Sequence, residues 1–245
     1  MFFHRDHVAA QAGRVDLAFT DRHGGVSTPP FDSLDLSRSR EGRDDELRTN
    51  LSRLADAFEV DGFATMTQVH GADVREVHVP GPVDEACDAL LTTDADVALC
   101  VRVGDCVPLV LADAEGGVVA VAHAGRPGVV AGVVPSTVAA MRDRGATTIH
   151  AWVGPRVCGG CYEVPASMRD EVAAVAPAAY ACTTWGTPSV DIGAAVISQL
   201  TAAGCTVHDV AACTRESADL YSHRRDGASA GRFGGIVVRR GAVHE

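Results

Sequence analysis

The chain has 245 residues and a mass of 25.5 kDa, which allows one large domain or two small ones and a core that folds without disulfides. Its formal net charge is −11, and every basic residue is Arg. This acidic balance argues against nucleic acid or an anionic membrane as the main partner, since both need a basic face.

The first part of the chain alternates expected strands with one surface helix. A strand is expected at residues 15–20, followed by a turn at the glycines 24–25. Leu47, Leu51, Leu54 and Phe58 recur at helical spacing and predict a helix over residues 43–58. Strands are then expected at residues 63–69 and 74–79, on either side of His70, before a break at Gly81-Pro82.

The middle and the end of the chain predict a buried sheet with helices packed on it. The nearly continuous apolar runs 97–103, 107–111 and 118–122 are typical of strands buried on both faces. The remaining expected elements are helices at 128–144, 165–175 and 190–203, strands at 148–153, 205–211 and 235–239, and a polar loop at 221–232. No repeat or linker divides the sequence, so a single α+β domain over residues 1–245 is expected.

The amino-terminal residues and the cysteines indicate in which cellular compartment the protein is expected. Residues 1–10 contain Arg5, Asp6 and two His, and therefore lack the apolar stretch of a signal peptide. Asp105 and Asp113 interrupt the most apolar region, which argues against a membrane span. The protein is therefore expected to be cytoplasmic, where its eight cysteines would be free thiols or metal ligands.

Three residues that can ligate a metal stand at the edges of expected strands. His70, Cys106 and His123 each adjoin a turn residue, so loops at one end of a sheet can bring them together. Two imidazoles and one thiolate suit Zn²⁺, with Cu²⁺ as the alternative. Three protein ligands leave one position for water or substrate, so the trio predicts a catalytic metal.

Six short blocks resemble, in order, those of the YfiH or laccase-domain family, also called polyphenol oxidases. They are Thr20–Ser27, Gln68–Gly71, Cys87–Thr92, Gly104–Pro108, Val121–Gly125 and Tyr221–Gly227. The resemblance implies an α+β fold in which two packed mixed β-sheets are flanked by helices, in α/β/β/α layers. It also implies that His70, Cys106 and His123 are the metal ligands.

The resemblance implies a purine nucleoside phosphorylase-like activity. Adenosine, inosine or methylthioadenosine would react with phosphate to give the free base and ribose 1-phosphate, and adenosine deamination would be a second activity. The block after His123 departs from the family pattern, because Arg126 and Pro127 stand where the family has Trp and Arg. Pro127 cannot bind an anion, whereas Arg126 can reach the same pocket from one residue earlier. Gly104 stands where the family usually has Ala, a small change.

Phosphorolysis needs phosphate held beside the ribose, and guanidinium groups fit phosphate oxygens well. The expected binding residues lie in loops near glycines or in the block after His123: Arg22, His23, Arg126, His223, Arg224, Arg225 and Arg232. Surface arginines are plentiful in a chain without Lys, so each of them also has an ordinary solvent-facing interpretation.

Asp105 is the carboxylate nearest to an expected ligand, Cys106. It is a candidate acid-base group for deamination, although a hydrogen bond to a loop amide is the alternative role. The sequence lacks the His-x-Glu and Pro-Cys-x-x-Cys pairing of zinc deaminases, so any deamination would use a different arrangement.

Cys158 and Cys161 have the spacing of a zinc knuckle or a redox pair. A structural zinc would need a second ligand pair, and none stands nearby at a suitable spacing. The resemblance instead suggests that Cys161, which precedes the residues Tyr162-Glu163-Val164, lies in the wall of the site.

Three other functions stay open from the sequence. A copper-dependent polyphenol oxidase is poorly supported by one ligand trio, since multicopper enzymes need several His-rich sites. A cysteine hydrolase would use Cys106 as its nucleophile beside His123. A nucleoside-binding protein without turnover would explain the altered block after His123.

Overall fold

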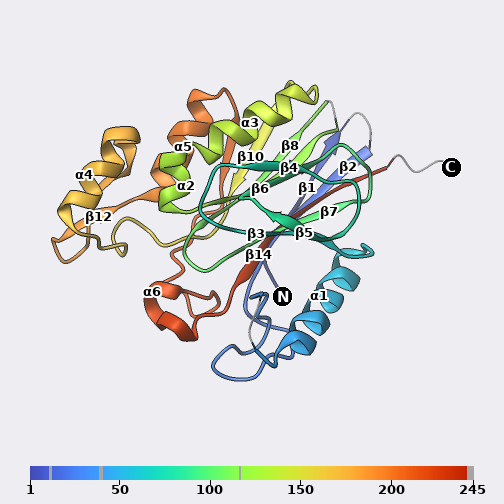
Figure 1. The fold of residues 1–245 in the computed structure, drawn as a ribbon, viewed down its shortest axis with the longest axis horizontal. Coiled ribbons are helices and arrows are strands. Elements are labelled where there is room, and N and C mark those ends of the chain that lie inside the picture. Colours follow the sequence, from blue (N-terminus) through green and yellow to red (C-terminus); the bar gives the residue numbers. More distant parts are fainter. Residues whose placement is uncertain (11–12, 39–40, 116, 242–245) are drawn as a thin grey trace.

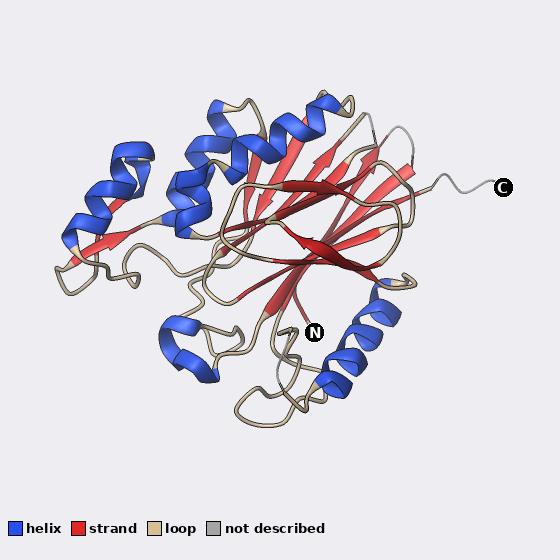
Figure 2. Cartoon of the chain, viewed as in Figure 1, coloured by secondary structure: helices blue, strands red, loops and turns tan. Residues whose placement is uncertain are grey.

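The computed structural model describes residues 1–10, 13–38, 41–115 and 117–241. Two six-stranded mixed sheets form the centre of this described part (Figures 1 and 2). In spatial order, the first sheet contains β1 (Phe2–Ala10), β2 (Gly13–Thr20), β14 (Phe233–Arg240), β7 (Ala98–Val103), β3 (Phe63–Thr67) and β5 (Gly81–Ala86). The second sheet contains β13 (Thr206–Asp209), β10 (Ile149–Val153), β8 (Val107–Asp113), β9 (Val119–Ala124), β6 (Ala89–Thr92) and β4 (Val74–Glu76).

Helix α1 (Asp44–Phe58) packs on the first sheet, and α2 (Arg126–Ala131), α3 (Val133–Asp143) and α5 (Ile192–Ala202) pack on the second. Helix α4 (Ala166–Val175) and the short helix α6 (His223–Asp226) lie beside the sheets (Figure 2). A small ribbon of β11 (Tyr180–Cys182) and β12 (Pro188–Val190) lies beside α4 (Figure 1). Within the described ranges, no helix combines the length and the apolar character that crossing a bilayer requires.

Strand alternation divides the apolar side chains into layers. In β7, Leu99, Val101 and Val103 belong to the core between the two sheets, whereas Cys100 packs with α1 on the outer face. Successive strand residues point to opposite faces, so a strand that is apolar throughout contributes to two cores at once. The expectation of two packed mixed sheets in α/β/β/α layers is confirmed.

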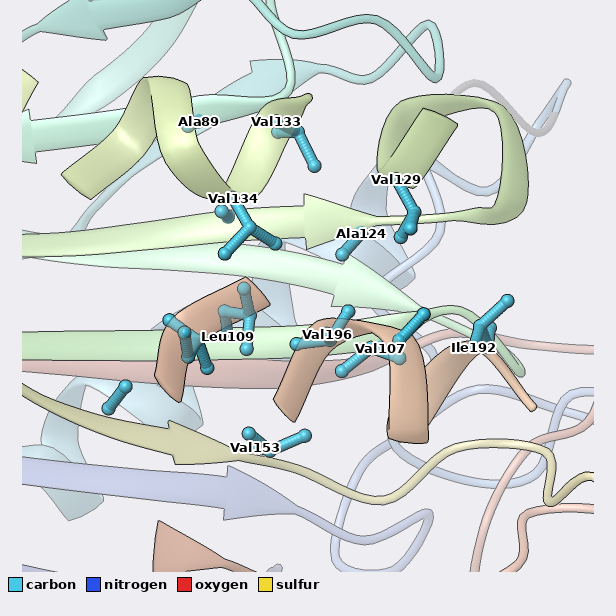
Figure 3. Packing of buried hydrophobic residues seen from close by; sticks show 14 of the residues in the cluster. Ala89, Val107, Leu109, Ala124, Val129, Val133, Val134, Val153, Ile192 and Val196 are labelled. Atoms are coloured by element: carbon cyan, nitrogen blue, oxygen red, sulfur yellow. The ribbon is translucent and has the colours of Figure 1, made fainter. Parts of the chain in front are cut away.

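The largest core lies between the second sheet and its helices. Figure 3 shows Val129 and Val133 at the start of the helical segment facing Ala124 of β9, while Val196 of α5 packs near Leu109 of β8. Small alanines on β9 let the helices approach the sheet closely. The low aromatic content of the chain is therefore compatible with a dense interior built from Val, Ala and Leu.

Four local features differ from what the sequence predicted. The single helix expected at 128–144 is two helices, because Gly132 adopts φ +89° between α2 and α3, a conformation that ends a helix. The Gly81-Pro82 break is instead the start of strand β5, and the amino-terminal strand β1 was not expected at all. The polar loop 221–232 contains the short helix α6.

Candidate metal centre

The three expected ligands come from turns and strand ends at one edge of the inter-sheet layer. His123 lies in β9 and continues the alternation of Val119 and Val121, which face the first sheet. Pro108 of β8 pairs with His123, so Cys106, in the turn before β8, lies next to the end of β9. His70 follows β3 and has a left-handed backbone with φ +62°.

The structure brings these three side chains together. One ligand atom from each of His70, Cys106 and His123 lies within 4.8 Å of the other two. Cys106 Sγ is 3.8 Å from His70 Nε2, and the two imidazole rings meet edge to face with centroids 4.6 Å apart. His123 is buried, Cys106 is half-buried and His70 is exposed, so the cluster is open on one side.

Asp88 orients two of the ligands from beneath. Its buried carboxylate accepts a hydrogen bond of 2.8 Å from His123 Nδ1, which leaves Nε2 of that ring free to ligate. The same carboxylate accepts the backbone N–H groups of Val69, His70 and Gly71, at 2.7–3.1 Å. These three bonds curl the loop around Asp88 and hold His70 in its left-handed conformation.

Gly125 gives the cluster its room. A Cβ atom at this position would lie 2.5 Å from His70 Cδ2 and 3.1 Å from Cys106 Sγ. Any side chain here would therefore push apart the two groups that must approach one another. The φ of Gly125 is −80°, a value that every residue type can adopt. Close packing, and not the backbone conformation, is therefore the reason for glycine at this position.

The electrostatics of the cluster favour a thiolate. Burial disfavours ionisation of Cys106, but the hydrogen bonds and positive charge of His123 and His70 outweigh it and lower the pKa of Cys106 to about 6. Burial likewise disfavours the imidazolium of His123, yet hydrogen bonds to Asp88 and Cys106 raise the pKa of His123 to about 9. Burial also opposes the charge of Asp88, but bonds from His123 and the loop amides hold the pKa of Asp88 below its usual value.

A cavity of about 750 Å³ opens in front of the cluster. Its lining includes His70, Cys106 and His123 together with apolar and aromatic groups such as Tyr162 and Ile192. Among the described lining residues, five carry a guanidinium and Asp105 alone carries a carboxylate; the five are Arg38, Arg102, Arg126, Arg224 and Arg232. A chain of net charge −11 thus concentrates positive charge where a ligand would enter.

Four of the residues expected to bind substrate line this cavity: Arg126, His223, Arg224 and Arg232. His223 Nδ1 lies 2.9 Å from the carbonyl oxygen of Gly227, which can only accept, so Nδ1 carries a proton and Nε2 remains for a ligand. The Arg224 guanidinium lies over the Tyr162 ring, 4.7 Å from its centroid.

Three other residues expected to bind substrate are not among the residues that line this cavity. Arg22 stacks on Tyr221 and donates to the carbonyl oxygen of Asp32. His23 Nε2 pairs with Asp219 at 2.9 Å. Arg225 donates to the carbonyl oxygens of Thr214, Ser217 and Leu220, and thereby ties the loop before α6 together. These side chains satisfy loop backbone and carboxylate groups instead of facing the cavity.

The carboxylate of Asp105 is occupied by structural hydrogen bonds. It accepts from Thr214 Oγ1 at 2.6 Å, from Ser222 Oγ at 2.7 Å and from the backbone N–H of Arg224. These contacts join the turn that carries Cys106 to the loop that carries Arg224. The geometry therefore favours the positioning role of Asp105 over acid-base chemistry.

Several residues of the site were not found from the sequence. Asp88 stood inside the block at 87–92 but offered no isolated signal, because its role depends on a loop 17 to 19 residues earlier in the chain. Gln68 and Arg102 clamp the loop before His70 to β7: Gln68 Nε2 donates to the carbonyl of Arg102, and the N–H of Arg102 donates to Gln68 Oε1. Such side chain to backbone pairs leave no periodic trace in a sequence.

Solved structures share this overall fold. The chain superposes on a Neisseria meningitidis protein with a TM-score of 0.84, at 27% identity over 98% of this chain and 99% of that one. YlmD from Geobacillus stearothermophilus gives a TM-score of 0.80 at 28% identity, with 92% of each chain covered. YfiH of Bacillus licheniformis, at 24% identity and a TM-score of 0.82, shares the fold. The chain therefore has the YfiH-like fold of these structures, with two packed mixed sheets.

The sequence comparisons agree with the structural ones. Residues 16–240 match the family model described as multi-copper polyphenol oxidoreductase laccase, and the chain belongs to this family. A Streptomyces coelicolor protein named purine nucleoside phosphorylase is 50% identical over 231 residues, which cover 90% of this chain and 94% of the relative. A Deinococcus radiodurans protein with the same name is 38% identical, with 91% and 88% covered.

Proposed function

We propose that this protein is a metal-dependent purine nucleoside phosphorylase. Adenosine, inosine or methylthioadenosine would react with inorganic phosphate to give the free base and a ribose 1-phosphate. The observation that carries the proposal is the His70, Cys106 and His123 cluster facing a cavity lined by five arginines. The printed names of relatives up to 50% identical support the same activity.

The donor set fits Zn²⁺. Two imidazoles and one thiolate form a common set of zinc ligands. The hydrogen bond from His123 to Asp88 fixes the tautomer of the His123 ring, as carboxylates beside ligating histidines do in zinc sites. When bound, the ion would supply a Lewis acid that polarises a substrate oxygen or a bound water. His70, Cys106 and His123 would hold it, and Cu²⁺ is the alternative that the family description suggests.

The residues of the chain would carry out the remaining tasks. Arg126, Arg224 and Arg232 would hold phosphate through charge-assisted hydrogen bonds, while Tyr162 and Ile192 would pack against the purine. One phosphate oxygen forms a bond to C1′ as the glycosidic C–N bond breaks, and the electron pair of that bond passes to the base nitrogen. The leaving base takes up a proton, for which His223 Nε2 is the available donor once protonated.

Adenosine deamination is proposed as a side activity of the same cavity. Water would replace the exocyclic amine at C6, and ammonia would leave. Because the three hydrogen bonds to Asp105 occupy its carboxylate, His223 is the better placed group for proton transfer. Inosine formed from adenosine in the absence of phosphate would measure this reaction separately.

The central test is to incubate the zinc-loaded protein with adenosine and phosphate and to quantify adenine and ribose 1-phosphate. Equal amounts of both products, lost in a Cys106→Ala variant, are expected. Absence of products with the metal confirmed would contradict the proposal. Oxygen consumption with a phenol and copper would favour the oxidase, and thiol labelling that the metal does not block would favour a cysteine nucleophile.

A further inference from the structure

A second group of metal-ligating side chains lies outside the site described above. Cys158, Cys161, Cys213 and Glu216 each place one ligand atom within 4.8 Å of the other three. The sequence offers the first two as a pair and gives no partner for them at close spacing. The fold supplies the missing pair from a segment more than 50 residues further along the chain.

Strand pairing explains why these two segments meet. β10 and β13 are parallel neighbours, so the loops that follow them leave the sheet side by side. The loops stay paired through Arg156, whose N–H donates to Ala212 and whose carbonyl accepts from Thr214, both at 3.0 Å. The backbone N–H of Cys158 then donates to Cys213 Sγ at 3.5 Å, which is the kind of bond that stabilises negative charge on sulfur.

The turn that carries the first two cysteines is tightly held. The N–H groups of Cys161 and Tyr162 both donate to the carbonyl oxygen of Cys158, at 2.9 and 3.0 Å. A Cβ atom on Gly159 would lie 2.9 Å from the Cβ of Asp191, so this turn packs too closely against the start of α5 for a side chain. The backbone that carries the two cysteines is therefore held by its own hydrogen bonds and by close packing.

We propose that Cys158, Cys161, Cys213 and Glu216 bind a second Zn²⁺ ion. Three thiolates and one carboxylate complete a tetrahedral set, which leaves no position for substrate and is typical of structural sites. Cys161 is buried, Cys158 and Cys213 are half-buried, and Glu216 is exposed. Glu216, which accepts from Cys161 Sγ at 3.4 Å, would close the site from the solvent side.

The Cys158 thiol needs a nearby cation to ionise readily. Burial and the neighbouring Cys213 and Cys161 thiols raise the pKa of Cys158 to about 12. A divalent ion reverses this balance because a coordinating thiol is deprotonated outright. A ligand set dominated by thiolates also favours zinc over hard cations such as Mg²⁺, which bind through oxygen.

The ion would fix one wall of the cavity. Cys161 precedes Tyr162, which lines the cavity under Arg224, and Cys213 precedes Thr214, which donates to Asp105 beside Cys106. A zinc ion bound to both loops would therefore fix the position of the cavity wall at Tyr162 relative to the turn that carries Cys106. Binding of this ion does not depend on the reaction proposed for the cavity.

Elemental analysis of the purified protein tests the site. The unchanged protein is expected to retain about two zinc ions per chain, and a Cys106→Ala variant about one. Cys158→Ser should lower the zinc content by about one ion, both in the otherwise unchanged protein and in the Cys106→Ala variant. The control Cys182→Ser, at an exposed cysteine, should keep the zinc content of the unchanged protein. Cobalt substitution adds a spectroscopic measurement, since thiolate-to-metal charge-transfer absorption should persist in Cys106→Ala and fall strongly in Cys158→Ser.

Two results would overturn the proposal. One is an equal zinc content in Cys158→Ser and in the unchanged protein, and the other is a disulfide among Cys158, Cys161 and Cys213 in protein purified without oxidant. If Cys158→Ser does not fold, thiol titration of the unchanged native protein decides. A chelator should allow Cys158, Cys161 and Cys213 to be alkylated, slowly at neutral pH because the raised pKa of Cys158 keeps its thiol protonated, and an alkylation pattern that stays unchanged after complete zinc removal contradicts the site.

Discussion

At the scale of single residues, Asp88 holds two of the three candidate ligands, His70 and His123, in place. Its carboxylate accepts from His123 Nδ1 and from three successive loop amides, so it sets both a ring tautomer and a backbone conformation. A neutral amide cannot accept all four bonds with the same strength. The arrangement of the ligands therefore depends on this buried negative charge.

Replacing Asp88 by Asn is expected to weaken zinc binding by about 10–100-fold, the usual effect of removing a carboxylate that orients a ligating histidine. The affinity can be measured by competition with a chromophoric chelator. Asp94→Asn, which removes an exposed partner of His78, is the matched control and should bind zinc as the unchanged protein does. Equal affinities for the two variants would show that Asp88 does not orient the site.

Gly125→Ala should disrupt the cluster without unfolding the protein. The added Cβ would lie 2.5 Å from His70 Cδ2, so the His70 ring must move away from Cys106. We expect a large loss of zinc content by elemental analysis, with near-normal circular dichroism. Gly62→Ala is the control, because its Cβ would meet nothing closer than Pro80 Cβ at 3.6 Å. A Gly125→Ala protein with full zinc content would contradict the packing described here.

The lowered pKa of Cys106, about 6, predicts thiol reactivity in metal-free protein. Below this pKa the thiol is protonated and slow to react, and above it the thiolate is present, so alkylation should rise with a midpoint near pH 6. The rate can be followed by mass spectrometry with iodoacetamide. Added zinc should suppress the reaction, and Cys106→Ala should lack it. A midpoint above about pH 8, close to that of a free thiol, would mean that the two imidazoles do not stabilise the thiolate.

At the scale of elements, the apolar runs of the sequence were enough to predict most strands, whereas the two-sheet layering was implied by the family resemblance. Val119 and Val121 face the first sheet while Ala120 and Ala122 face the helices, which is the period of two that a strand requires. Strand β1 was missed because its polar residues gave no such pattern, and its position comes from pairing with β2. The helix break at Gly132 was missed because glycine is also tolerated inside helices.

Gly132→Ala tests the helix break. Its φ of +89° is a left-handed conformation that costs a residue with a Cβ about 1–2 kcal/mol. The free energy of unfolding in urea should fall by about this amount, and metal content should stay unchanged because Gly132 is neither a candidate ligand nor part of the cavity lining. Gly62→Ala, whose backbone is not left-handed, should change stability by less. Equal midpoints for both variants would show that the break tolerates a side chain.

At the scale of the whole molecule, the candidate metal centre and its cavity contain some residues that could be predicted from the sequence and others that could not. His70, Cys106 and His123 were accessible through their residue types and their short blocks, and the fold brings them together. Arg38 and Arg102 were missed because an arginine carries no local sign of which surface it faces. For the same reason the sequence could not show that the side chains of Arg22 and Arg225 bind backbone carbonyls outside the cavity lining.

The distribution of charge over the molecule yields the last prediction. Arg126→Ala and Arg48→Ala each add one negative charge to a chain of formal net charge −11, but Arg126 lines the cavity while Arg48 is an exposed residue of α1 paired with Asp45. Charges farther apart than a Debye length of about 8 Å are largely screened at physiological salt, so only the local change should affect an anion in the cavity.

Arg126→Ala is therefore expected to raise the KM for phosphate by about tenfold or more, which corresponds to the loss of one charge-assisted hydrogen bond. Arg126→Lys should recover part of this loss, because an ammonium keeps the charge but not the forked geometry. Arg48→Ala should leave the phosphate KM unchanged. If both alanine variants shifted it equally, the net charge of the molecule would govern phosphate binding, and the arginine lining would lose its assigned role.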